Sequence, residues 1–218
     1  MRRTAGYILF VLVVLAATAF GQPVPIPISP APTQPGVPGR TVLVFLPQQL
    51  FSGEEFEPAL GQLTRAGLQT RIASYATGVA SSMDQVLVNT DLALRDASVA
   101  DYAGLVLIGG SGAALYWDDS LVQAKCREFA NNGKVVAAIG IAPITLARAG
   151  VLKGRKATVF HDRDAVNWLR QAGAKFSFKE LVADRNIITA ATDDQARAFG
   201  RAVAAAVLTG KARNPKPE

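Results

Sequence analysis

The turn after residues 135–139 is the place in this sequence where a catalytic side chain would be expected, and it carries no reactive residue. Residues 135–141 read VVAAIGI, a run of small and β-branched residues that predicts a buried strand, and a helix-compatible run follows it. In an open α/β sheet, nucleophiles and ligands lie where such a strand meets the next helix, because the start of the helix offers unpaired N–H donors. The residues at this turn are Gly140 and Ile141, whose side chains can neither attack, ionise nor bind a metal.

The remaining reactive residues do not replace the missing group. Cys126 is the only cysteine and falls in the helix predicted before this strand, where a buried structural thiol is expected. His161 is the only histidine, so no multi-histidine metal site or histidine-dependent triad can form. The pairs Asp118-Asp119 and Asp193-Asp194 most simply begin helices. We therefore predict neither a bound metal nor a cofactor.

A glycine-rich turn, Gly109-Gly110-Ser111-Gly112, follows a second apolar run at residues 105–108. On one interpretation, these glycines at the end of the strand do no more than permit a tight turn and close packing of the next helix. The N–H groups of this turn can also combine with the helix start after Gly140 to form a pocket for a carboxylate or phosphate. On this second interpretation the ligand-binding residues are Gly109, Gly110, Ser111, Gly140 and Ile141.

Strands alternate with helices around these turns. Residues 79–90 are ambiguous between a hairpin-like excursion and a loop. Strands are predicted at residues 41–46, 69–74, 105–108, 135–141 and 157–160, helices at 54–66, 120–131, 164–172 and 193–208, and a late hairpin at 181–182 with 187–189. Such alternation favours a mainly parallel sheet covered on both faces, the flavodoxin-like doubly wound class.

The two ends of the chain differ from its middle. Residues 1–21 combine an N-terminal Arg2-Arg3 pair, an apolar stretch at 7–20 and small residues before Gln22, the pattern of a signal peptide. The apolar stretch is shorter than the roughly 20 residues that cross a bilayer, which favours a cleaved signal over a membrane anchor. Residues 22–40 are proline-rich and predict an extended linker, 41–208 one globular domain, and 209–218 a disordered tail. We expect an exported protein, secreted, periplasmic or in the cell envelope, whose only membrane attachment would be an uncleaved anchor.

The composition of the chain limits the kinds of molecule that it is expected to bind. The chain has 218 residues, of which 50% are hydrophobic and 18% charged, enough for a packed core. Its net charge of +6 is diffuse, apart from Lys153, Arg155 and Lys156 and a basic tail. The sequence has no basic stripe with interleaved aromatic residues, so we do not expect it to bind nucleic acid. A single cysteine excludes an intramolecular disulfide.

Three motifs in sequence order carry a family resemblance: LVLIGGSGA at residues 105–113, VVAAIGIAPITLARAGVLKGRKAT at 135–158 and DRNIITA at 184–190. With them, residues 41–208 resemble the ThiJ/PfpI family of the DJ-1 superfamily. This resemblance implies the class I glutamine amidotransferase-like fold, a three-layer sandwich, and a homodimer.

The resemblance also implies an active site that this chain only partly keeps. Family members have a nucleophilic cysteine at the strand–helix elbow, often followed by histidine, and a glutamate from the first strand–helix junction hydrogen-bonded to the thiol. Gly140 and Ile141 occupy the first two positions here. The glutamate position, counted forward from Phe51, falls at Ser52, with Glu54 and Glu55 close by.

Three functional hypotheses follow. Losing a covalent nucleophile costs several powers of ten in rate, which favours a catalytically degenerate protein, a pseudoenzyme, that binds a small anionic molecule or a protein partner in the former cleft. The alternative is an active hydrolase or glyoxalase/deglycase-type enzyme in which Glu54 or Glu55 acts as a base on water. The third is a structural dimerisation module.

Overall fold

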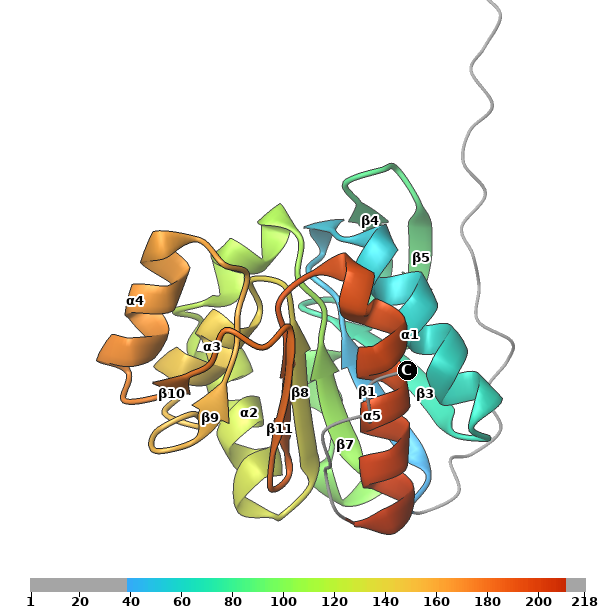
Figure 1. Cartoon of the computed structure of the whole chain (residues 1–218). Coiled ribbons are helices and arrows are strands. Elements are labelled where there is room, and N and C mark those ends of the chain that lie inside the picture. The colour runs from blue at the N-terminus through green and yellow to red at the C-terminus, as the bar shows by residue number, and fades with distance from the viewer. Residues whose placement is uncertain (1–38, 211–218) are drawn as a thin grey trace, which may run out of the picture.

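A computed structural model of the chain describes residues 39–210, which form a twisted seven-stranded sheet between two layers of helices (Figure 1). All neighbouring strands are parallel except the pair at one edge, β11 and β12, which is antiparallel. In spatial order the strands are β11 (Leu181–Asp184), β12 (Ile187–Ala190), β8 (Val135–Ile139), β7 (Gly104–Leu107), β1 (Thr41–Phe45), β3 (Gln69–Ser74) and β6 (Leu92–Ala93).

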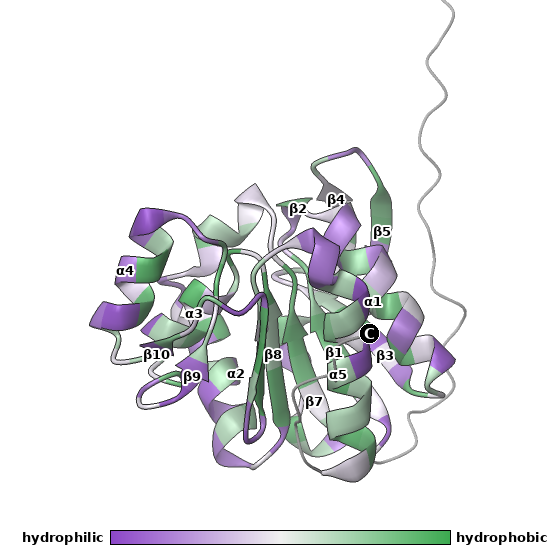
Figure 2. Ribbon diagram, viewed as in Figure 1, coloured by the Kyte–Doolittle hydropathy of each residue, from purple (hydrophilic) through white to green (hydrophobic). Residues whose placement is uncertain are grey.

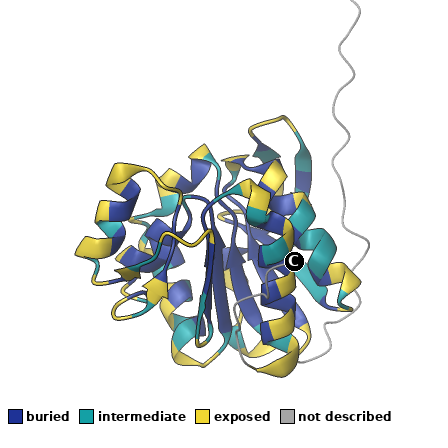
Figure 3. Ribbon diagram, viewed as in Figure 1, coloured by how far each residue is buried: buried dark blue, intermediate teal, exposed yellow. Residues whose placement is uncertain are grey.

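The central strands are apolar throughout because both of their faces are covered. Every residue of β1, β7 and β8 is buried, and the hydrophobic colouring of these strands in Figure 2 coincides with their burial in Figure 3. A strand buried on both faces reads as a continuous apolar run instead of an alternating one, which is why these three could be predicted from sequence.

Helices cover the two faces unequally. One core cluster packs α1 (Gly53–Arg65) and α5 (Ala196–Thr209) against the sheet, and the other packs α2 (Ser120–Asn131), α3 (Pro143–Arg148) and α4 (Arg163–Gln171). Four 3₁₀ turns complete the described helices: η1 (Leu94–Asp96), η2 (Val99–Asp101), η3 (Ser111–Tyr116) and η4 (Asp193–Gln195). This arrangement confirms the predicted flavodoxin-like, class I glutamine amidotransferase-like architecture.

Helices α1 and α5 approach each other closely at Gly200. A β-carbon at this position would lie 2.6 Å from the carbonyl oxygen of Ala59 and 2.9 Å from the β-carbon of Gln62. Only a residue without a side chain allows this approach. The position of α1 therefore depends on a glycine in α5.

Two small sheets flank the main one. The strands β2 (Gln49–Phe51), β4 (Gly78–Ser82) and β5 (Leu87–Thr90) form the first, and the antiparallel β4–β5 pair settles the ambiguity at residues 79–90 in favour of a hairpin. The second consists of β9 (Lys156–Ala157) and β10 (Lys175–Phe176).

Two predicted elements differ from the structure. The strand expected at 157–160 is reduced to β9, because the backbone beyond it turns away: Thr158 N–H donates to Thr189 Oγ1 and Phe160 N–H to the Gly140 carbonyl. The helix expected from Asp193 begins at Ala196, after the 3₁₀ turn η4.

Both aspartate pairs lie at the start of a helical element, but only Asp118-Asp119 supplies a side-chain cap. The side chain of Asp119 accepts a hydrogen bond from Val122 N and caps α2, whereas Asp118 pairs with Arg148 at 2.8 Å. Neither Asp193 nor Asp194 caps η4 with its side chain.

The predicted signal peptide or anchor, most of the linker and nearly all of the tail lie outside residues 39–210. Within that range, no helix is both long and apolar enough to cross a membrane.

Candidate functional site

The turn after β8 is fixed by backbone hydrogen bonds on both sides. Gly140 has a φ of +66°, the left-handed region in which glycine is strongly favoured. Its N–H donates to the carbonyl of Ala190 at 3.0 Å, and its own carbonyl accepts from Phe160 N–H at 2.9 Å. Strand β12 and the segment after β9 thus hold the elbow in place before α3 begins.

The carboxylate at the elbow belongs to Glu55. Ser52, the residue indicated by counting from Phe51, is instead the N-cap of α1: its Oγ accepts from Glu55 N–H at 3.2 Å, and its N–H donates to the Gly109 carbonyl at 3.1 Å. The Glu55 side chain then points inward, and its Oε2 accepts from Gly109 N–H at 2.7 Å. The spacing Ser-x-x-Glu is that of a capping box, a sequence signal that could have singled out Glu55.

Glu55 and Gly140 fit together with no space to spare. A β-carbon built on Gly140 would overlap Oε1 of Glu55. The carboxyl group therefore occupies the volume that the first atom of any side chain at the elbow would need. A cysteine here would require Glu55 to move as well as a strained backbone at residue 140.

Glu55 is a buried carboxyl group, only 6% exposed. Burial raises its pKa from 4.5 to about 7, the charge of Asp193 acts in the same direction, and the hydrogen bond from Gly109 opposes both. A carboxyl with this pKa is protonated in a large fraction of molecules near neutral pH, so it can either donate or accept a proton.

A shallow pocket of about 250 Å³ opens beside these groups. Within residues 39–210, the amide N–H groups of Gly110 and Ile141 have no hydrogen-bond acceptor, and both residues line the pocket. Of the predicted ligand-binding residues, only Gly109 lies outside the lining, and its N–H donates to Glu55. The complete lining is Glu55, Gly110, Ser111, Gly140, Ile141 and Phe160.

Phe160 was not predicted, because its place in the pocket depends on the turn after β9 and not on any local motif. The residue is 49% exposed. It supplies an apolar edge to a pocket whose polar groups come from Glu55 and the backbone.

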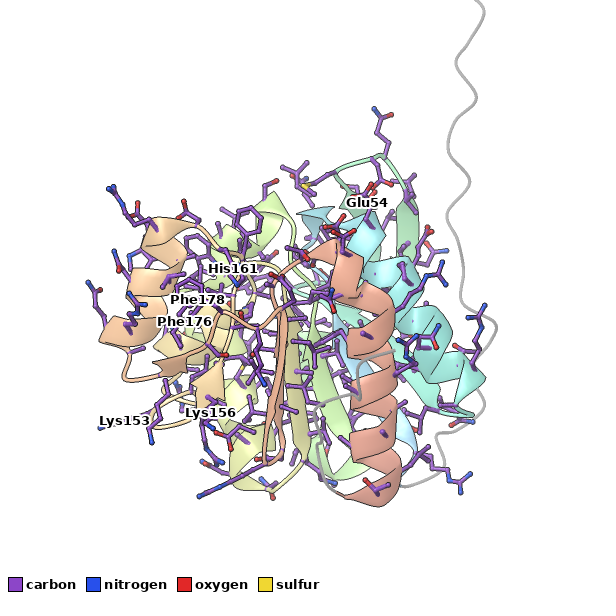
Figure 4. The ribbon with its side chains drawn as sticks, in the orientation of Figure 1. Glu54, Lys153, Lys156, His161, Phe176 and Phe178 are labelled. Atoms are coloured by element: carbon purple, nitrogen blue, oxygen red, sulfur yellow. The ribbon has the colours of Figure 1, made fainter. Side chains whose placement is uncertain are left out.

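Glu54 is not part of this pocket. It is exposed in the first turn of α1 (Figure 4). A hydrogen bond with the Asp193 side chain raises the pKa of Glu54, and the negative charge of Asp193 raises it further. The two adjacent glutamates therefore differ completely in environment, and only Glu55 faces the elbow.

The single histidine and the single cysteine lie elsewhere. His161 Nε2 is 3.3 Å from Thr158 Oγ1, its Nδ1 is 3.5 Å from Glu180 Oε1, and its ring packs edge-on against Phe176 and Phe178 (Figure 4). Cys126 is fully buried in α2, and burial raises the pKa of its thiol to about 12. In the described part of the chain, no cluster of three His, Cys, Asp or Glu residues could hold a metal.

Known proteins share this arrangement of elements. The DJ-1/PfpI family matches residues 40–206. An uncharacterised protein of Methanocaldococcus jannaschii is 35% identical, with 77% of this chain and 82% of that protein covered. The protein named deglycase PfpI of Pyrococcus furiosus is 30% identical, with 67% and 87% covered.

A solved structure agrees with these relatives. The crystal structure of a ThiJ/PfpI domain protein from Brachyspira murdochii superimposes with a TM-score of 0.75 at 26% identity, over 78% of this chain and 97% of that one. The family match spans the sheet, both helical layers and the elbow, so the chain belongs to the DJ-1/PfpI family.

Proposed function

We propose that this DJ-1/PfpI protein binds a small molecule in the elbow pocket and is catalytically degenerate with respect to thiol chemistry. One observation carries the proposal: the Glu55 carboxyl fills the volume in which the β-carbon of a nucleophile at residue 140 would lie. The only thiol of the chain, Cys126, is fully buried in another helix with its pKa raised to about 12. Neither the elbow nor its surroundings supplies a thiolate.

The lining favours a ligand with a carbonyl or carboxylate oxygen. Protonated Glu55 offers one hydrogen-bond donor, and the amides of Gly110 and Ile141 offer two more. The Phe160 ring and the Ile141 side chain suit a short apolar group next to that oxygen. A small anionic ligand fits this donor set while Glu55 is protonated, and ionised Glu55 would repel it.

Titration with pyruvate, monitored by NMR, tests the proposal. Pyruvate carries both oxygen types and stays an anion between about pH 6 and pH 8, so a change in affinity reports on the protein. With a Glu55 pKa of about 7, we expect binding about tenfold weaker at the higher pH. Glu55→Gln should abolish this pH dependence.

Glu57→Gln is the matched control, because Glu57 is an exposed residue of the same helix and should keep the full pH dependence. Absence of pyruvate binding at about pH 6, or a pH dependence that survives Glu55→Gln, would contradict the proposal.

A second function is favoured by the pKa of Glu55. A carboxyl that titrates near neutrality is suited to general acid–base catalysis on a carbonyl compound, and several relatives of this chain bear the name deglycase. Consumption of methylglyoxal by the purified protein, lost in Glu55→Gln and retained in Glu54→Gln, would establish this function in place of simple binding. Under the first proposal, all three proteins leave methylglyoxal unchanged.

We also propose export, on the signal-peptide pattern of residues 1–21. Exposed thiols are readily oxidised in an oxidising compartment, and a site without a reactive thiol cannot be inactivated in this way.

A further inference from the structure

Two lysines stand directly opposite each other in the small sheet outside the main one. Lys156 of β9 and Lys175 of β10 are register partners in a parallel pair, so their side chains leave the sheet on the same face. Like charges at directly opposite positions of neighbouring strands destabilise the pairing. Lys156 belongs to the basic cluster of Lys153, Arg155 and Lys156, none of which lines the elbow pocket.

A third lysine joins them around a hollow. The hollow has a volume of about 290 Å³, and Lys179 lines it together with Lys156 and Lys175. Phe176 and Val182 also line it, so the hollow combines positively charged and apolar residues. Figure 4 shows Lys156 and Phe176 on the side of the molecule that carries β9 and β10. We call this feature the lysine hollow.

The nearby acids are engaged with other groups. Asp184 Oδ2 accepts from the Lys156 backbone N–H at 2.7 Å, and its Oδ1 lies 3.9 Å from an Arg155 nitrogen. Glu180 lies beside His161. Among residues 39–210, none of the three ammonium groups of the lysine hollow forms an ion pair.

We propose that the lysine hollow binds a small organic anion, a phosphate or carboxylate group attached to an apolar body. The anionic group would lie between Lys156 and Lys175 and relieve their mutual repulsion. The apolar body would lie against Phe176, the partly buried aromatic residue of the lining. This site shares no lining residue with the elbow pocket, so the proposal does not depend on the function proposed there.

Calorimetric titration with phenyl phosphate tests this proposal. We expect one phenyl phosphate per chain, bound at least about tenfold more tightly than inorganic phosphate, because only the former covers the apolar wall. Benzyl alcohol, which has the ring without the charge, should not bind measurably. Benzoate in place of phenyl phosphate shows which anionic group the lysines prefer. Amide shifts confined to Lys156 and its neighbours in β9 and to residues 175–183 in NMR spectra should place the ligand.

The double variant Lys156→Gln/Lys175→Gln should lose phenyl phosphate affinity by at least about tenfold. Without ligand it should melt about 1–3 °C higher than the native protein, because the cross-strand repulsion is gone, which shows that the loss is not caused by misfolding. Lys153→Gln is the matched control, an exposed neighbouring lysine outside the lining that should change affinity less than about twofold.

Affinity unchanged in the double variant would overturn the proposal. If inorganic phosphate bound as tightly as phenyl phosphate, the proposed contact with an apolar group would be wrong. If the double variant and Lys153→Gln lost the same affinity for phenyl phosphate, binding would depend on the overall positive charge of the protein and the proposed site would be wrong.

Discussion

At the scale of single residues, the elbow is defined by the pair Glu55 and Gly140. Each explains the other: the glycine leaves room for the carboxyl, and the carboxyl fills the room that the glycine leaves. The burial that holds Glu55 there disfavours its charge and raises its pKa. The same carboxyl should therefore make the stability of the whole protein depend on pH.

The sign of this dependence follows from the two pKa values of Glu55, 4.5 for the ordinary group and about 7 in the folded protein. Between these values the folded chain binds more protons than the unfolded chain, so the free energy of unfolding falls as pH rises and levels off above about pH 7. The loss due to Glu55 is about 3 kcal/mol at most. Relative to the native protein, Glu55→Gln should be equally stable near pH 4.5 and about 3 kcal/mol more stable near pH 8.

Urea unfolding across this pH range measures the difference between the two proteins, so that other titrating groups cancel. Glu57→Gln should follow the native curve. A constant difference between Glu55→Gln and the native protein at all pH values would mean that Glu55 titrates normally.

At the scale of elements, α1 positions Glu55 and α5 positions α1. Gly200→Ala would drive a β-carbon into the Ala59 carbonyl, and overpacking of this kind costs about 1–3 kcal/mol. Gly61→Ala is the matched control in α1, where an added β-carbon meets no atom within 4 Å and should stabilise the protein by about 0.5–1 kcal/mol. Urea unfolding should show the two alanines acting in opposite directions, and stabilisation by both would disprove the close contact.

The elements themselves were largely readable from sequence. β3 and α2 occupy the predicted residues, because Gly67 marks the end of the helix before β3 and α2 is a capped amphipathic helix, and both are local patterns. The strand predicted at 157–160 is too long because Thr158 and Phe160, beyond β9, bond to β12 and to the elbow through single hydrogen bonds instead of a ladder. The Glu55 carboxyl could not be located by counting, because its direction depends on the Ser52 cap and on contact with Gly109, which is 54 residues away.

At the scale of the whole molecule, the proposed export rests on residues 1–21. If residues 1–21 are a cleaved signal, the mature protein should begin at Gln22. Mass spectrometry of the protein purified from its native host measures this directly. An intact N-terminus in the soluble fraction would contradict cleavage and export, and an intact N-terminus in the membrane fraction would indicate the anchor. The homodimer expected from the family resemblance stays a prediction that light scattering can check.

The burial of Cys126 gives the protein an internal kinetic reporter. Because it is the only sulfhydryl group of the chain and its side chain is fully covered by the core, an aromatic disulfide reagent can react with it only when α2 separates from the sheet. The rate of colour release then follows opening of the domain in unmodified protein. Substitutions in either pocket can thus be ranked for their effect on opening without any engineered label.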